Sequence, residues 1–303
     1  MRGRAFDVYV VVDWSASSTP KLGPDSIWVH VRDATDTVAA DPVNLPTRAS
    51  AFGYLRDTLC AAAGRRVLVG LDMPYGYPSG FAAAAGFDDA AASPWRSTWR
   101  ALVGALADGP DNANNRFEVA SAWNRRVGDG PGPFWGTTST RHVTPWLSRT
   151  KAPGFPHAGL AEHRSAELAL RRRGLRPFSV WQLAGAGSVG SQTLTGIPVV
   201  HALHTDPTLG PRSRLWPFET GLTDDPAAGR ADAVVHAEIW PSALGRPDPA
   251  RHPVKDAGQV TALTERLAAL DAAGDLAHRF APRLDRGESR AAVGEEGWIL
   301  DVT

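Results

Sequence analysis

The chain has 303 residues, of which 43% are hydrophobic, with equal numbers of acidic and basic residues. This length allows one large domain with insertions or two modest domains. No apolar run approaches the ~20 residues that span a bilayer, so we expect no membrane partner. The single cysteine, Cys60, excludes a disulfide framework and a cysteine-based zinc cluster. The apolar run at residues 8–12 is short and is followed by Asp13-Trp14, which indicates a buried strand rather than a secretory signal and, by default, a cytoplasmic protein.

The first part of the chain has the pattern of strands around one helix. β-Branched and alternating apolar residues predict strands at 6–12, 26–32 and 35–40. Thr47 can cap a helix that runs to Ala63 and stops at Gly64. A further buried strand covers residues 67–71 and is followed by Asp72.

The rest of the chain contains more helix than strand. We expect helices near 94–107, 116–126, 159–173 and 254–273, and partly helical structure at 178–204. Strands are predicted at 214–220 and 232–239, and the tail at 297–302 is too short to assign. Trp95 and Trp99 are spaced one helical turn apart, which is more typical of core residues than of base-stacking platforms.

This order of elements predicts an α/β fold with a mixed sheet and flanking helices. We expect residues 1–93 to form the first part of the core and residues 218–303 the second part with the C-terminal helix. Residues 94–217 would form a large Trp/Arg-rich insertion or lid rather than an independent domain.

Positive charge is concentrated in that middle segment. Residues 94–217 carry 15 Lys and Arg against 7 Asp and Glu, and seven of the eleven tryptophans. A basic, Trp-rich segment between acidic ends suggests a surface for a phosphate-bearing ligand such as a nucleic acid or nucleotide. A solvated arginine surface with no ligand is an equally open interpretation.

Three predicted strands end in a carboxylate. Apolar runs lead into Asp13, Asp72 and Glu238, and Asp256 stands at the start of the last long helix. Parallel strands gather their carboxyl ends at one edge of a sheet, where ligands bind. Carboxylates crowded there repel one another unless a cation neutralises them, and hard oxygen ligands favour Mg²⁺ or Mn²⁺. Each residue also has an ordinary interpretation, as a turn residue or a helix-start carboxylate.

These motifs resemble an uncharacterised family of predicted ribonuclease H-like nucleases. The resemblance is carried by Asp13-Trp14-Ser15, by Leu71-Asp72-Met73-Pro74-Tyr75-Gly76 and by Glu238-Ile-Trp-Pro241, with Asp256 in the place of a late helical Asp. It covers about residues 5–80 and 230–275, while the large middle departs from the short members of the family. The resemblance implies a ribonuclease H-like core and two-metal hydrolysis of a phosphodiester. Asp13 would then bridge the metals, Asp72 and Glu238 would hold one each, and Asp256 would complete the second site.

Two loops are candidates for binding a nucleotide cofactor. Residues 185–190 form a G-x-G-x-x-G string, but its surroundings do not suit a dinucleotide-binding βαβ unit. A loop that holds phosphate through backbone N–H groups at Gly187 and Ser188 is the more plausible functional interpretation. Ser15 follows Asp13 in a turn that contacts ATP phosphates in kinase-like relatives of this fold, although the glycine usual in that turn is absent.

Three functions remain open at this stage. The first is a Mg²⁺- or Mn²⁺-dependent phosphodiester hydrolase, a nuclease, in which Asp13, Asp72, Glu238 and Asp256 are catalytic and bind metal. The second is an ATP-using phosphoryl-transfer enzyme on the same fold. The third is a non-catalytic protein that binds a ligand or partner.

Overall fold

The computed structural model describes residues 3–36, 40–151, 154–185, 187–244 and 252–302. Its centre is a six-stranded sheet in the order β3-β2-β1-β4-β6-β5. The strands, in chain order, are β1 Val8–Asp13, β2 Ile27–Asp33, β3 Val43–Leu45, β4 Val67–Asp72, β5 Ser213–Leu215 and β6 Val234–Glu238. The first three pair antiparallel, whereas β1, β4, β6 and β5 run parallel to one another. The predicted α/β fold with a mixed sheet is therefore confirmed.

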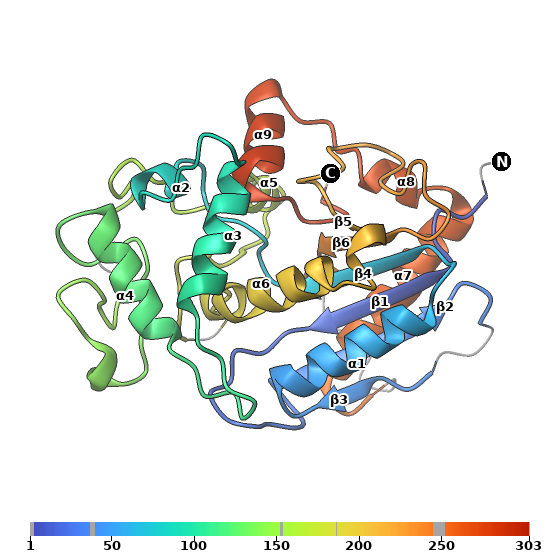
Figure 1. Ribbon diagram of the computed structural model, residues 1–303, viewed down its shortest axis with the longest axis horizontal. Coiled ribbons are helices and arrows are strands. Elements are labelled where there is room, and N and C mark those ends of the chain that lie inside the picture. Colours follow the sequence, from blue (N-terminus) through green and yellow to red (C-terminus); the bar gives the residue numbers. More distant parts are fainter. Residues whose placement is uncertain (1–2, 37–39, 152–153, 186, 245–251, 303) are drawn as a thin grey trace.

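Helices flank this sheet (Figure 1). The longer ones are α1 Arg48–Ala61, α3 Pro94–Ala105, α4 Arg116–Val127, α5 Ser165–Arg172, α6 Gly190–Thr205 and α7 Lys255–Ala273. The short helices are α2 Phe81–Ala84, α8 Leu276–Arg279 and α9 Arg286–Ala291. Within the described residues, no helix is both long and apolar enough to cross a membrane.

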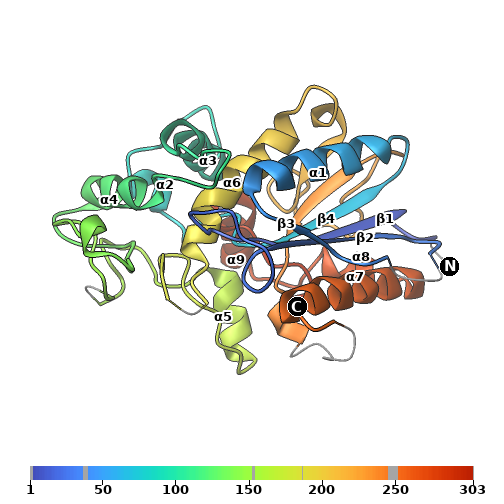
Figure 2. The ribbon, with the colours of Figure 1, turned by 90° about the horizontal axis from the view of Figure 1, so that it is seen from below.

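The pleat of the strands divides the core into two layers. Val8, Val10 and Val12 of β1 pack with residues of α1, α3 and α6, while Tyr9 and Val11 pack with residues of α7 and α8. Alternate residues of a strand point to opposite faces, so each buried strand supplies both layers. Figure 2 shows α1 and α6 on one side of the sheet and α7 on the other.

Most predicted elements form close to the expected residues. The Thr47 side chain caps α1 by accepting a hydrogen bond from the Ser50 backbone N–H at 3.1 Å, as the sequence predicts. The strand expected at 35–40 falls partly on residues 37–39, which lie outside the described part of the chain. Thr35 lies in a turn closed by its backbone N–H donating to Asp33 Oδ1, and β3 forms later, at Val43–Leu45.

Two further boundaries differ from expectation. The helix expected at 159–173 begins only at Ser165, because Arg164 has extended backbone and caps it. The strand expected at 214–220 ends at Leu215, two residues before Pro217, which has no N–H to donate to a sheet.

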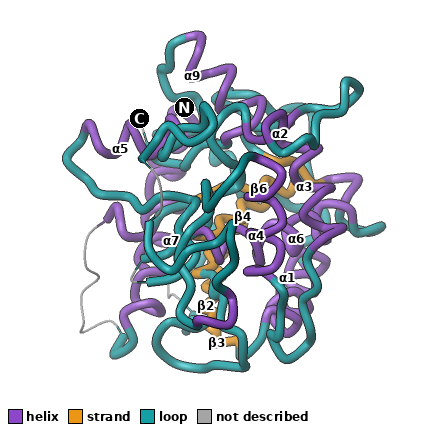
Figure 3. The backbone as a smooth tube through the Cα atoms, turned by 90° about the vertical axis from the view of Figure 1, so that its left-hand side faces the viewer, coloured by secondary structure: helices purple, strands orange, loops and turns teal. Residues whose placement is uncertain are grey.

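The predicted insertion, residues 94–217, contributes directly to these layers. Helix α6 packs on the sheet beside α1, and β5 pairs with β6 at the sheet edge. Five of its tryptophans are buried, which accounts for most of the Trp-rich composition: Trp95, Trp99, Trp123, Trp181 and Trp216. The prediction that Trp95 and Trp99 are core residues is confirmed. In Figure 3 loops and α4 lie in front of the strand ends, at the side toward which β1 runs.

The turn after β4 fits tightly against the C-terminal segment. A Cβ atom added at Gly76 would lie 2.2 Å from the backbone oxygen of Glu295 and 2.7 Å from the backbone of Glu296. We expect Gly76→Ala to lower the free energy of unfolding by about 2 kcal/mol or more, because the backbone on both sides must move. Gly53→Ala, in the middle of α1 with nothing within 4 Å, should instead raise it by ~0.5–1 kcal/mol. Urea denaturation of both variants tests this, and equal effects would contradict the tight contact at Gly76.

Candidate metal and phosphate site

Two aspartates lie side by side at the ends of neighbouring parallel strands. Asp13 is the last residue of β1 and Asp72 the last of β4, and the two are direct partners in the register. Strand spacing therefore brings their backbones within ~5 Å. By the pleat, both side chains lie on the face covered by α7, since Val11 and Leu68 belong to that layer of the core.

These two carboxylates have no donor to stabilise them. Neither Asp13 nor Asp72 accepts a hydrogen bond from another side chain or backbone group in the described part of the chain, although both are half-buried. Asp271, a buried carboxylate elsewhere in the core, accepts hydrogen bonds from the backbone N–H groups of Ala5 and Phe6 and from the Tyr9 hydroxyl. An ionised carboxylate without donors is costly, so the protonated form is favoured here unless a cation lies beside the pair.

The electrostatics of the two aspartates follow from this. Burial raises the pKa of Asp13 well above its ordinary value, and the charges of Asp72 and Asp256 raise it further. Burial, together with the charge of Glu238, raises the pKa of Asp72 to about 7. Lys255 acts in the opposite direction on both carboxyls.

Asp256 joins the pair from the first turn of α7. Its Oδ2 accepts a hydrogen bond of 2.7 Å from the backbone N–H of Asp25, which fixes the start of α7 to the loop that follows β1. Asp13, Asp72, Asp256 and Glu238 all line one cleft of about 820 Å³. The structure thus brings the four predicted carboxylates to one cleft. Among the described residues, no group of three or more His, Cys, Asp or Glu side chains is arranged so that it could hold a metal ion.

Glu238 differs from the aspartates because its charge is already paired. The pleat of β6 turns it to the opposite face from Val235 and Ala237 of the α7 layer. Arg164 donates to both of its carboxylate oxygens, from Nη1 at 2.8 Å and Nη2 at 2.6 Å, and the Tyr75 backbone N–H donates to Oε2 at 3.0 Å. Burial raises the pKa of Glu238, and Arg164 opposes that effect.

Arg164 is the centre of a buried network that the sequence did not reveal. It is fully buried, it is shared between Glu238 and Glu167, and its Nη1 also donates to the backbone oxygen of Glu296 at 2.7 Å. Glu295 accepts from the backbone N–H groups of Gly80 and Ala82. The segment just before the unassigned tail therefore supports the turn that follows Asp72. The adjacent glutamates before Gly297-Trp298 were the available signal for this role.

The three predicted cofactor-binding residues also line the cleft: Ser15, Gly187 and Ser188. The Ser15 hydroxyl is occupied, since it donates to the backbone oxygen of Asp25 at 3.1 Å. A Cβ at Gly187 would lie 2.0 Å from the Phe178 ring, so packing alone explains this glycine. The glycine string at 185–190 does not follow a strand of the main sheet. The β-pairing described just before it is an isolated bridge between Gln182 and Trp135.

Comparisons of the chain with protein-family models, with characterised proteins and with solved structures gave no match. The resemblance to ribonuclease H-like nucleases therefore remains a prediction from the motifs around Asp13, Asp72 and Glu238.

The buried network predicts a strong stability effect. We expect Arg164→Met to lower the free energy of unfolding by about 3–5 kcal/mol, because it leaves buried carboxylates without a counter-charge. Glu238→Gln in the same background should recover part of that loss, since it removes one unpaired charge. A double-mutant cycle by chemical denaturation measures the coupling. Additive losses from the two substitutions would contradict a direct pair.

Asp13 and Asp72, which accept no hydrogen bond from a described residue, predict that a substitution can stabilise the fold. In a buffer that contains a metal chelator, Asp72→Asn should raise the free energy of unfolding by roughly 1–2 kcal/mol. The substitution removes the repulsion with Asp13 and the cost of burying a charge. Asp57→Asn, on the exposed surface of α1 with a side chain that is 82% exposed, is the matched control and should change little. Thermal and urea unfolding test both variants, and a destabilised Asp72→Asn would count against the repulsion.

Proposed function

We propose that this chain is a Mg²⁺- or Mn²⁺-dependent phosphodiester hydrolase, a nuclease or nucleotide-cleaving enzyme, built on a ribonuclease H-like core. The observation that carries the proposal is the pair Asp13 and Asp72, which are adjacent and half-buried and accept no hydrogen bond from a described residue. The antiparallel trio β1–β3, followed through α1 by β4 parallel to β1, supports the proposed type of core.

The residues of the cleft fit a hard divalent cation. Mg²⁺ characteristically binds through one or two carboxylates together with water and substrate phosphate oxygens, rather than in a complete protein cage. Asp13 and Asp72 provide two such carboxylates, and Asp256 reaches the same region from α7. A bound cation would activate water and offset the negative charge of a phosphate.

Other residues of the chain have distinct roles in this proposal. Asp13 and Asp72 would hold the cation, and Asp256, fixed by the Asp25 backbone N–H, would complete its surroundings. Glu238 enters as a positioning residue, because Arg164 and the Tyr75 backbone occupy its oxygens. It keeps the turn after Asp72 in place and adds negative charge near Asp72. Its earlier assignment as a metal ligand stays a prediction, and here the paired geometry favours the supporting role.

The second candidate is an ATP-using phosphoryl-transfer enzyme. It is favoured by one observation, that Ser15, Gly187 and Ser188 line the cleft together with Asp13 and Asp72. A non-catalytic binding protein would keep the same cleft without turnover.

Metal binding and hydrolysis should depend on Asp13. We expect Mn²⁺ and Mg²⁺ to raise the melting temperature of the wild-type chain, and Asp13→Asn to remove most of that rise because it deletes one ligand. Hydrolysis of bis(p-nitrophenyl) phosphate, then of RNA and single-stranded DNA, should fall at least ~100-fold in the same variant, since lost charge stabilisation of that size is about 2.7 kcal/mol. Asp57→Asn is again the matched control.

The outcomes separate the candidates. No cation-dependent shift in the wild-type chain would contradict both enzyme proposals. A shift with ATP and Mg²⁺ but no cleavage of any phosphodiester would favour the ATP-using enzyme. A cation shift with neither cleavage nor ATP binding would favour the non-catalytic protein.

A further inference from the structure

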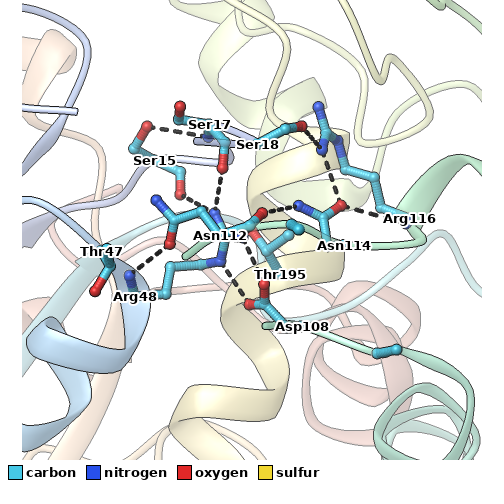
Figure 4. Close-up of polar contacts among 12 residues, drawn as sticks. Ser15, Ser17, Ser18, Thr47, Arg48, Asp108, Asn112, Asn114, Arg116 and Thr195 are labelled. Atoms are coloured by element: carbon cyan, nitrogen blue, oxygen red, sulfur yellow. Dashed lines mark hydrogen bonds and ion pairs between the residues drawn. The ribbon is translucent and has the colours of Figure 1, made fainter. Parts of the chain in front are cut away.

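Arg116 lines the same cleft as Asp13 and Asp72. It is the first residue of α4 and its guanidinium is held by neutral oxygens. Nε donates to Ser191 Oγ at 2.9 Å. Nη1 donates to Ser18 Oγ at 2.8 Å and to Asn114 Oδ1 at 2.9 Å (Figure 4). Its planar group also lies over the Phe117 ring, 4.4 Å from the ring centre. The guanidinium is therefore held in one orientation.

Arg116 forms no ion pair with a described residue, although the charges of Asp108 and Glu118 act on it from farther away. None of its hydrogen-bond acceptors is a carboxylate, and no Asp or Glu described by the structure lies within 4 Å of it. Its Nη2 makes no hydrogen bond to a described residue. Burial and the nearby charge of Arg48 lower the pKa of Arg116 to about 10, so the side chain is still a cation at neutral pH.

Arg48, which lies near Arg116 in Figure 4, is an example of an arginine with a structural role. It is almost fully buried and forms a bidentate pair with Asp108, with both nitrogen–oxygen distances at 2.6 Å. Its Nη1 donates to the backbone oxygens of Ser15 and Ser17. Arg48 thus fixes the loop that carries Ser18, and so fixes one partner of Arg116, while all of its own charge is compensated.

We propose that Arg116 binds a phosphate group of the substrate in this cleft. The inference rests on the proposed function for its substrate class, and it adds a specific residue for recognition. A fixed, planar guanidinium with one nitrogen free matches the geometry of a phosphate oxygen. Arg116 and Lys255 are the basic residues among those described as lining the cleft. Lys255 lies next to Asp256 and acts on the carboxyls, which leaves Arg116 for the anion.

Calorimetric titration with inorganic pyrophosphate tests the inference, on the metal-free chain and on the Mn²⁺-saturated chain. We expect Arg116→Gln to weaken pyrophosphate binding about tenfold or more in each state in which the wild-type chain binds it. The pyrophosphate affinity of Arg116→Lys should lie between those of the wild-type chain and Arg116→Gln, because lysine keeps the charge but lacks the planar guanidinium. Arg125→Gln is the matched control, since Arg125 lies on the same helix over the Trp146 ring and outside the cleft lining.

Titration with Mn²⁺ alone distinguishes failure of this inference from failure of the proposed function. Arg116→Gln should bind Mn²⁺ with wild-type affinity, and thermal unfolding should show that the variant is folded. If Arg116→Gln is not folded, the comparison of Arg116→Lys with Arg125→Gln decides. Wild-type pyrophosphate affinity in the Arg116 variants, or no pyrophosphate binding by the wild-type chain in either state, would overturn the inference. Absence of Mn²⁺ binding would instead contradict the metal-dependent function and leave the metal-free titration as the test of Arg116.

Discussion

The in-register parallel pairing of β1 with β4 forces Asp13 and Asp72 to share one edge of the sheet. The apolar residues before them are buried on both faces, so a one-residue shift of either strand would exchange the side chains that pack in the two core layers. The two carboxylates therefore stay adjacent despite their repulsion. The packing of the rest of the sheet offsets the free-energy cost of this repulsion. Local costs of this kind are typical of functional sites.

Three arginines around the cleft divide into two kinds. Arg164 and Arg48 are almost fully buried and bind carboxylates through bidentate contacts. Arg164 also binds the backbone oxygen of Glu296, and Arg48 those of Ser15 and Ser17. They fix the positions of the turn after Asp72 and of the loop after Asp13. Arg116 is held as firmly, but by neutral oxygens. The difference in counter-charge, rather than in rigidity, is what separates an arginine that builds the cleft from one that is free to bind a ligand.

The apolar strand runs and the Thr47 cap are local signals, so the sequence was sufficient to place β1, β4, β6 and α1 and to bring the four carboxylates to one region. The face on which each carboxylate lies is not a local property. It depends on the register between strands, which turns Glu238 away from the α7 layer and toward Arg164. The partners of Glu238 lie 74 and 163 residues away in the chain, and no spacing rule predicts such pairs. Two other contacts are equally distant in the chain and equally unpredictable from spacing. They are the packing of the Glu295 and Glu296 backbone against Gly76 and the hydrogen bond from Arg48 to the backbone oxygen of Ser15.

The charge of the cleft links its two proposed ligands. Its described lining contains six acidic side chains, Asp13, Asp25, Asp72, Glu167, Glu238 and Asp256, and two basic ones, Arg116 and Lys255. Arg164 compensates Glu167 and Glu238 only in part, since one guanidinium serves two carboxylates. When these carboxylates are ionised, a phosphate meets net negative charge near the aspartates, and attraction there requires a divalent cation. Arg116 offers the complementary attraction on the chain itself. A ligand with two anionic groups, such as a diphosphate or adjacent phosphates of a polynucleotide, satisfies both at once, whereas a lone carboxylate satisfies only one of them and a neutral ligand satisfies neither.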